Sequence, residues 1–324
     1  MTSALDSCFS YLLDEKTLVG RIGAGVRVPP LRLFTLRQLG IDQDMFIGEL
    51  LPTFSTLHLD PYDAKRNKIA FLKRRLPSAG QTLDGFLPRY YAGETDLDEI
   101  HDLIRTLKDA DRHEFDRIGL TGRRKRSVAS FDCFRTGGGK ARVRPQNDWF
   151  LRRIPAQGFA QNVASTDPRS FTRVFHEASE RLMENPSLLP RLMENLAAMV
   201  GELHPEAHAL KMTMHQMFIF ADMMTEGDNA PEGIHQDGAD YIVSALVVER
   251  AGILGGESIV YAPDKKTELL RHTLMPGEGI FQDDRTLWHD VTPFKEDPRT
   301  PPAYGSRSIF GFDITLARAL IFSL

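Results

Sequence analysis

Apolar residues before residue 210 recur mainly at helical spacing. After Thr95 they return every three or four positions up to Leu107, as on one face of a helix. Asp167-Pro168 has the form of an N-cap followed by proline at the first helical position, so a helix is expected from there to about residue 182. A second helix is expected from about residue 186 to residue 203, where leucine, methionine and valine share one face.

After Lys211 the chain changes to short β-rich runs separated by glycine, proline and aspartate. The predicted strands cover residues 211–220, 240–248, 257–261, 271–275, 279–282 and 307–315. Short strands punctuated by turn residues are typical of a barrel or jelly roll and not of alternating βαβ units. The upstream helices, with their apolar faces, are expected to cover one face of such a sheet.

The pattern therefore predicts an α+β protein that forms one structural unit with three parts. Residues 1–50 are an N-terminal extension, residues 51–209 a mixed and mainly helical part, and residues 210–324 the β core. The mainly helical part is expected to pack on the outside of the core.

Composition narrows the class of protein. The chain has 324 residues, of which 42% are hydrophobic and 26% charged, the balance of a globular protein with a sizeable core. The net charge of −4 gives no electrostatic footprint for nucleic acid. No apolar run approaches the roughly 18–20 residues that a membrane span needs. Two cysteines, Cys8 and Cys133, are too few for a disulfide framework. We expect a cytoplasmic protein without nucleic-acid or membrane partners; its oligomeric state stays open.

Two conspicuous stretches are expected to be loops. The basic run Arg123-Arg124-Lys125-Arg126 has no interleaved aromatic residues and no basic face to extend it, so a solvated loop is the expected structure. The triple glycine in residues 136–148 lacks the Gly-Lys-Ser/Thr ending of a phosphate-binding loop, which argues against nucleotide binding.

His-x-Asp occurs twice, each time with a further histidine about fifty residues downstream. The two sets are His58, Asp60 and His113, and His235, Asp237 and His289. Residues i and i+2 of a strand project to the same side, so such a pair offers two ligands to one ion. Two imidazoles and a carboxylate on one face of a metal, with other positions open, form the site of non-haem Fe(II) oxygenases.

Sequence context separates the two sets. His113 lies at the charged end of a predicted helix, and Asp60 precedes a proline, where a helix cap is the simpler role. His235 and Asp237 lead into a predicted strand, and His289 lies in extended-looking sequence that a barrel can bring close. We therefore predict the second set as the metal ligands.

Arg307 opens the last predicted strand, 18 residues beyond His289. An arginine inside a barrel is an uncompensated charge unless it meets an anion, and its planar fork suits a carboxylate. A dicarboxylate that chelates iron at one end and meets Arg307 at the other satisfies this need. The alternatives are a surface position or an internal ion pair with Asp313.

These residues together resemble the 2-oxoglutarate/Fe(II)-dependent dioxygenase superfamily. Its order of motifs is matched by His235-x-Asp237, the Gly255-Gly256-Glu257 segment, His289 and Arg307. PEGIHQDG, GGESIVY, DDRTLWHDVTP and GSRSIFGFDIT more narrowly resemble the bacterial and fungal group that contains L-isoleucine hydroxylases. LHLDPYDAKRNK and WFLRRIPAQGFAQN resemble that group's N-terminal half, so the likeness covers roughly residues 50–315.

The resemblance implies a double-stranded β-helix (a cupin-like jelly roll) with helices outside. It also implies His235, Asp237 and His289 as iron ligands and Arg307 as the partner of 2-oxoglutarate, with O2 as the other cosubstrate. The expected reaction is hydroxylation of a free aliphatic amino acid at an unactivated C–H, with release of succinate and CO2. For the substrate, Glu232 and Asp240 are candidates to meet the ammonium group, and Arg144 and Gln146 lie in a loop that resembles the group's N-terminal signature.

Three alternatives stay open at this point. The same iron site supports oxidative cyclisation or desaturation of the amino acid instead of hydroxylation. A non-catalytic barrel with a structural or vestigial metal site is possible in another class of protein. A cupin-like zinc or manganese enzyme fits less well, because cupins cluster more histidines than this chain offers.

Overall fold

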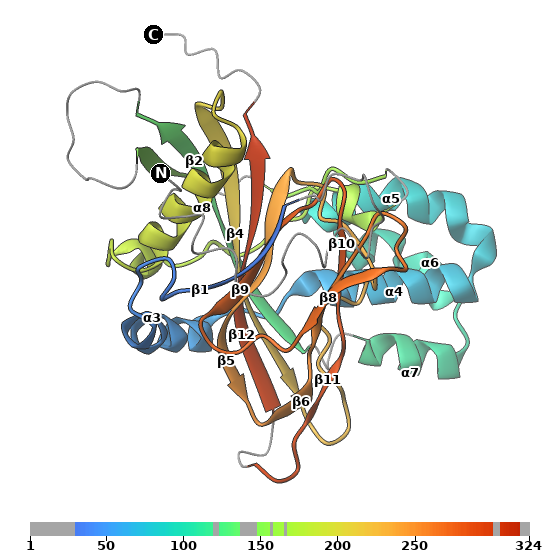
Figure 1. Ribbon diagram of the computed structural model, residues 1–324. Coiled ribbons are helices and arrows are strands. Elements are labelled where there is room, and N and C mark those ends of the chain that lie inside the picture. The colour runs from blue at the N-terminus through green and yellow to red at the C-terminus, as the bar shows by residue number, and fades with distance from the viewer. Residues whose placement is uncertain are drawn as a thin grey trace.

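The centre of the molecule is an antiparallel sheet of seven strands (Figure 1). The computed structural model describes residues 30–118, 123–136, 148–155, 158–164, 167–300 and 305–317. The strand order is β1-β9-β5-β12-β4-β2-β3. These strands are β1 (Leu31–Thr35), β2 (Arg124–Arg135), β3 (Trp149–Ile154), β4 (Ala209–Ala221), β5 (Tyr241–Ala251), β9 (Glu278–Asp283) and β12 (Gly305–Leu316).

Shorter strands form two further sheets. One has the order β10-β7-β8, from Trp288–Val291, Ser258–Tyr261 and Glu268–His272, and the other pairs β11 (Phe294–Glu296) with β6 (Ile253–Gly255). Ile219, Val247 and Ile309 of the large sheet share one buried apolar cluster with Val260 and Leu270 of the three-stranded sheet. The two sheets therefore face each other across an apolar layer.

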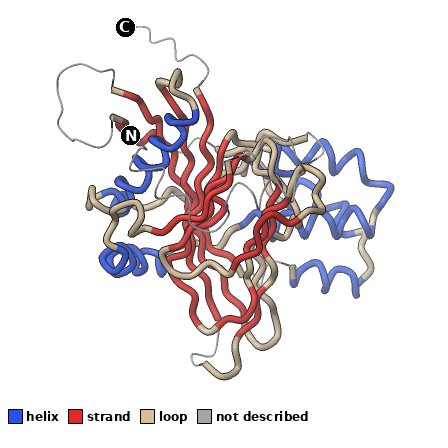
Figure 2. The backbone as a smooth tube through the Cα atoms, in the orientation of Figure 1, coloured by secondary structure: helices blue, strands red, loops and turns tan. Residues whose placement is uncertain are grey.

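The helices pack in two groups on opposite sides of this β core (Figures 1 and 2). α3 (Gln43–Leu50) and α8 (Leu189–Leu203) cover the outer face of the large sheet, where Phe46 and Leu196 join a cluster with Met214 and Phe310. The second group has an apolar core of its own. Its members are α4 (Pro61–Arg75), α5 (Gly80–Ala92), α6 (His101–Arg105) and α7 (Asp109–Arg117).

Packing of α8 against the sheet makes a large contribution to stability. We expect Leu196→Ala to lower the free energy of unfolding by about 2–5 kcal/mol, because Leu196 is fully buried and the smaller side chain leaves a cavity. Leu203→Ala removes the same atoms from a residue of α8 that is 43% exposed, so a change within about 0.5 kcal/mol is expected. Urea unfolding of the metal-free protein measures both. Equal losses in the two variants would contradict this packing role.

The structure confirms most of the predicted elements. α8 lies where the second helix was expected, and strands cover the predicted β runs, with β8 ending earlier, at His272. Three strands of the large sheet, β1, β2 and β3, come from before residue 210. The proposed division of the chain at that residue stays a prediction.

The prediction of a helix after Asp167 is wrong. Only a single 3-10 turn forms at Pro168–Ser170, and the chain then continues without a helix to Ser179. The backbone N–H and C=O groups of Arg173 are bonded to Phe159, and Ala178 donates its N–H to Val128. These bonds to segments outside the local sequence replace the intrahelical bonds that the apolar spacing predicted.

The basic run is also not a solvated loop. Arg124 and Arg126 lie in β2 with buried or nearly buried side chains, while Arg123 is paired with Asp222 at 2.6 Å. Arg124 donates from Nε to Asp60 (3.1 Å) and from Nη2 to Asp63 (2.8 Å). Acids that lie about sixty residues earlier in the chain neutralise this arginine, which is why the local sequence did not reveal its burial.

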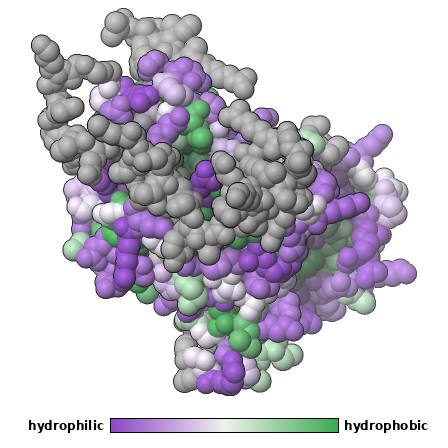
Figure 3. Space-filling view, viewed as in Figure 1, coloured by the Kyte–Doolittle hydropathy of each residue, from purple (hydrophilic) through white to green (hydrophobic). Residues whose placement is uncertain are grey.

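Where Figure 3 is coloured, hydrophilic side chains predominate, and apolar side chains lie in small separate patches. Within the described ranges, no helix has both the length and the apolar character needed to cross a membrane. The cytoplasmic location stays a prediction.

Candidate metal centre

Two histidines that are far apart in the sequence are brought side by side by the backbone. His235 precedes β5 and His289 lies in β10, and each donates its N–H to the carbonyl oxygen of the other at 2.9 Å. Cross-strand partners in such a bridge place their side chains on the same face. The centroids of the two imidazole rings are accordingly 4.2 Å apart.

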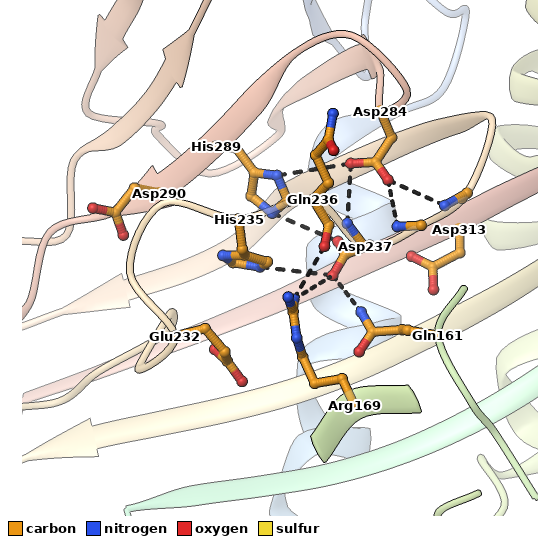
Figure 4. A network of polar contacts seen from close by, with 12 residues as sticks. Gln161, Arg169, Glu232, His235, Gln236, Asp237, Asp284, His289, Asp290 and Asp313 are labelled. Carbon is orange, nitrogen blue, oxygen red and sulfur yellow. Dashed lines mark hydrogen bonds and ion pairs between the residues drawn. The ribbon is translucent and has the colours of Figure 1, made fainter. Parts of the chain in front are cut away.

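Asp237 completes the cluster (Figure 4). Its Oδ1 lies 3.6 Å from Nε2 of His235, and its Oδ2 lies 3.5 Å from Nε2 of His289. One potential ligand atom from each of the three residues lies within 4.8 Å of the others. This spacing suits a single ion bound between them on one face.

Neighbouring groups fix the position of Asp237. Gln161 donates from Nε2 to its Oδ1, and the carboxylate of Asp284 accepts the backbone N–H groups of residues 237, 238 and 239 at 2.7–3.1 Å. Gln161 and Arg169 approach the carboxylate from one side and Asp284 lies on the other (Figure 4). Gly238 has φ +83°, and a Cβ there would lie 2.5 Å from the carbonyl oxygen of Asn162, so the turn requires glycine.

The protonation states suit metal binding. Nδ1 of His235 lies 2.7 Å from the carbonyl oxygen of Gly233, to which it donates, and this leaves Nε2 free to act as a ligand. Burial and the neighbouring His235 lower the pKa of His289 to about 3, so its ring is neutral. Burial opposes ionisation of Asp237, but the histidines around it and Arg169 hold its pKa at about 2. Two neutral imidazoles and an ionised carboxylate are the forms that bind a metal.

A cavity of about 80 Å³ opens beside these three side chains, and it contains a fourth histidine. His215 of β4 is 4% exposed, and its Nδ1 accepts a hydrogen bond from Arg126 (2.7 Å) while its Nε2 donates to Asp313 (3.1 Å). Burial lowers the pKa of His215 well below its usual value and raises that of Asp313. His215 was not predicted as a site residue, because a single histidine inside an apolar strand carries no signal of its own.

Arg307 is fully buried, which rules out the surface position. It lies on β12 two residues before Ile309, on the face that lines the cavity. Its only hydrogen bond within the described chain is a long one of 3.5 Å to Ser258, and its Nε and Nη1 have no partner there. Asp313 is bonded to His215 and not to Arg307. Burial, together with Arg250, lowers the pKa of Arg307 to about 9, as expected for a cation without an anion.

The other candidate residues are distributed differently. Glu232 lines the cavity, with its carboxylate 3.6 Å from Arg66. Asp240 accepts the N–H of Leu316 at 2.7 Å and lies 3.6 Å from Arg285, and it does not line the cavity. Arg144 and Gln146 lie outside the described residues.

The rejected His-x-Asp set does not form a cluster. Asp60 caps α4 by accepting the N–H of Tyr62, as predicted, and His58 stacks on His176 at 3.9 Å between centroids. His113 is exposed on α7. Within the described chain, only the second set brings three potential ligands together.

Comparisons with known proteins place this site in a family. A sequence model described as 2OG-Fe dioxygenase matches residues 111–313, and no curated protein matches the sequence. The crystal structure of a bsmA homolog from Methylobium petroleophilum PM1 aligns with a TM-score of 0.61 and 18% identity over 95% of this chain and 96% of that one. This alignment shows a shared fold.

Two further solved structures align less well. IDO from Bacillus thuringiensis has a TM-score of 0.43 and 17% identity over 60% of this chain and 75% of its own. The Fe(II)/(alpha)ketoglutarate-dependent dioxygenase TqaL has a TM-score of 0.42 and 12% identity over 80% and 93%.

The chain is therefore an iron-dependent oxidoreductase, a dioxygenase whose cofactor and cosubstrates are Fe(II), 2-oxoglutarate and O2. It belongs to the 2OG-Fe dioxygenase family.

Proposed function

We propose that this dioxygenase hydroxylates a free aliphatic amino acid at an unactivated C–H, with release of succinate and CO2. His235, Asp237 and His289 hold the iron, and Arg307 binds the distal carboxylate of 2-oxoglutarate. The observation that carries the proposal is the buried Arg307, which lacks an anion and lies on β12 two residues before Ile309, a residue that lines the same cavity as His235, Asp237 and His289. Fe(II) with 2-oxoglutarate and O2 supplies the oxidising power for attack on an unactivated C–H bond.

The arrangement of the sheets supports a double-stranded β-helix as the architecture of this site. The large and the three-stranded sheet face each other across an apolar layer. His289 comes from the smaller sheet, while Arg307 comes from the larger one. A cosubstrate that bridges the metal and Arg307 would lie between the two sheets, excluded from water.

The walls of the site suit a small zwitterion. The inner cavity adjoins a second one of about 720 Å³, and both are lined by Gln161, Arg173, Asp237 and Asp313. This volume is in the range of sites for small molecules. Glu232 supplies a negative charge in the inner wall and Arg173 a positive one, as an amino acid requires.

Two measurements test this function. Anaerobic addition of Fe(II) and 2-oxoglutarate should give the visible metal-to-ligand charge-transfer band. In air, valine, isoleucine, leucine or a close analogue should stimulate succinate formation. Product mass distinguishes insertion of oxygen from loss of two hydrogens, the result expected of cyclisation or desaturation. A charge-transfer band with no stimulation by any free amino acid, but stimulation by a peptide or carrier-bound substrate, would refute the substrate assignment and leave the iron site standing.

A further inference from the structure

Four arginines line the inner cavity, and two of them are neutralised by carboxylates of the chain. Arg124 is bonded to Asp60 and Asp63, and Arg169 forms a forked pair with Asp167 at 2.8–3.1 Å. The other two are Arg126 and Arg173.

Arg126 has no carboxylate within hydrogen-bond distance in the described chain. Its Nη1 lies 4.0 Å from Oδ2 of Asp60, an oxygen that already accepts from Arg124. Its Nη2 is bonded to the neutral ring of His215, and its Nε is buried without a partner. The side chain is only 10% exposed.

Arg173 also has a buried guanidinium group without a carboxylate partner in the described chain. Its Nη2 donates to the amide oxygen of Gln161 at 2.7 Å and, at 3.5 Å, to the carbonyl of Arg169. Its Nε is buried without a partner, and the residue is 4% exposed. Hydrogen bonds to neutral groups alone do not offset the desolvation free energy of a buried cation.

Aromatic rings hold the two guanidinium groups near each other. Both lie over the ring of Phe175, at 4.5 Å for Arg126 and 5.6 Å for Arg173. Tyr62 and Phe159 pack against Arg173 at 4.6 and 5.3 Å. Burial and then the charge of Arg126 lower the pKa of Arg173 to about 10. Two like charges thus lie at the same aromatic ring, each with an unused N–H.

The remaining acids of the cavity do not supply the missing anion. Glu232 lies 3.6 Å from Arg66 and forms no ion pair with Arg126 or Arg173 in the described chain, and Asp237 belongs to the cluster of potential metal ligands. Asp313 is bonded to His215, and burial raises its pKa well above the usual value. An Fe(II) ion adds two further positive charges beside these groups.

The position of the pair distinguishes it from the 2-oxoglutarate anchor. Arg126 of β2 pairs with Met217 of β4, and Met217 pairs in turn with Ile309 of β12. Arg307 lies on β12 two residues before Ile309. β2 and β12 are two strands apart, which is about 10 Å. One carboxylate group is too small to meet both Arg126 and Arg307.

We propose that Arg126 and Arg173 form a receptor for the carboxylate of the substrate. The inference rests on the proposed amino-acid oxygenase function and makes a free carboxylate the feature that the enzyme selects. Arg173 borders both the inner and the outer cavity. A carboxylate held there leaves the alkyl part of the substrate among apolar side chains such as Phe159 and Met212 of the outer cavity.

The test compares an amino acid that stimulates succinate formation with its carboxamide. The wild type should prefer the acid in kcat/KM by about ten- to a hundredfold, as expected for charge-assisted bonds. Arg126→Gln and Arg173→Gln should each lower kcat/KM for the acid by a similar factor and leave the amide nearly unchanged. Arg173→Lys keeps the charge but loses the fork, so it should recover part of the preference. The KM for 2-oxoglutarate should not change.

Arg152→Gln is the matched control, because Arg152 has a 54% exposed side chain on β3 outside both cavities. Calorimetric titration of the metal-free protein with L-leucine and L-leucinamide gives a readout without turnover. Glutamine variants that fold, as judged by circular dichroism, but keep the wild-type preference would overturn the receptor. If L-leucine binds through Arg173 but no amino acid is turned over, the amino-acid oxygenase function fails and the receptor stands. If L-leucine does not bind and no amino acid is turned over, both the receptor and the amino-acid oxygenase function are overturned.

Discussion

Asp237→Ala, His235→Ala and His289→Ala should each reduce turnover to background while the protein stays folded. Each substitution removes one of three potential ligand atoms that lie within 4.8 Å of one another. The side chains stand at the wall of a cavity and not in the apolar clusters, so the cores stay intact. Succinate formation and equilibrium binding of Fe(II) under anaerobic conditions measure the effect.

A graded variant and a matched control make this result specific. Gln161→Ala removes a hydrogen bond to Asp237 without removing a ligand, so we expect metal affinity to fall about 10–100-fold and not to vanish. His58→Ala alters the other His-x-Asp pair, whose histidine stacks on His176 and lies outside the cluster, so iron binding should not change. Loss of iron binding in His58→Ala, with binding retained in His235→Ala, would show that the wrong pair was assigned.

Arg307→Leu should raise the KM for 2-oxoglutarate sharply. A forked contact between arginine and a carboxylate contributes about 1.5–3 kcal/mol, so the expected rise is about ten- to a hundredfold. Iron affinity should change little, because Arg307 is not one of the clustered ligands. The KM from succinate formation and the dissociation constant from the anaerobic charge-transfer band both report this change.

Stability gives a second and independent readout for Arg307. Because its guanidinium is buried with only one long hydrogen bond in the described chain, leucine removes an uncompensated charge and should not lower the free energy of unfolding. Arg299→Leu, at a side chain that is 77% exposed, serves as the control for loss of a positive charge. An unchanged affinity for 2-oxoglutarate in Arg307→Leu would place the cosubstrate carboxylate elsewhere.

The local pattern of apolar and turn residues was sufficient to predict the helices and strands in which that pattern repeats along the whole element. α8 shows apolar residues at helical spacing over its whole length, and the strands after residue 210 are separated by turn residues. Context also separated the two His-x-Asp pairs, because a proline after Asp60 marks a helix start.

Prediction failed where pairing with a distant segment outweighs local preference. The run 123–126 is basic in any local window, yet β2 is paired with β4 along nearly its full length and Arg124 is neutralised by Asp60 and Asp63. Residues 171–182 show helical spacing, but the backbone bonds of residues 173, 176 and 178 go to Phe159 and Val128. Neither partner can be identified from the residues that surround these segments.

The sequence by itself determined the candidate ligand types, their order along the chain and the likeness to iron-dependent oxygenases. These depend on residue type and short spacing, which a strand converts directly into side chains on one face. Only the tertiary structure decided which charges remain without a partner. Arg124, Arg126 and Arg307 are all strand arginines, but only Arg124 is bonded to carboxylates. Whether a buried cation is neutralised depends on distances of a few ångströms between residues that are far apart in the chain, because the energy of an ion pair falls with separation and the cost of burial does not.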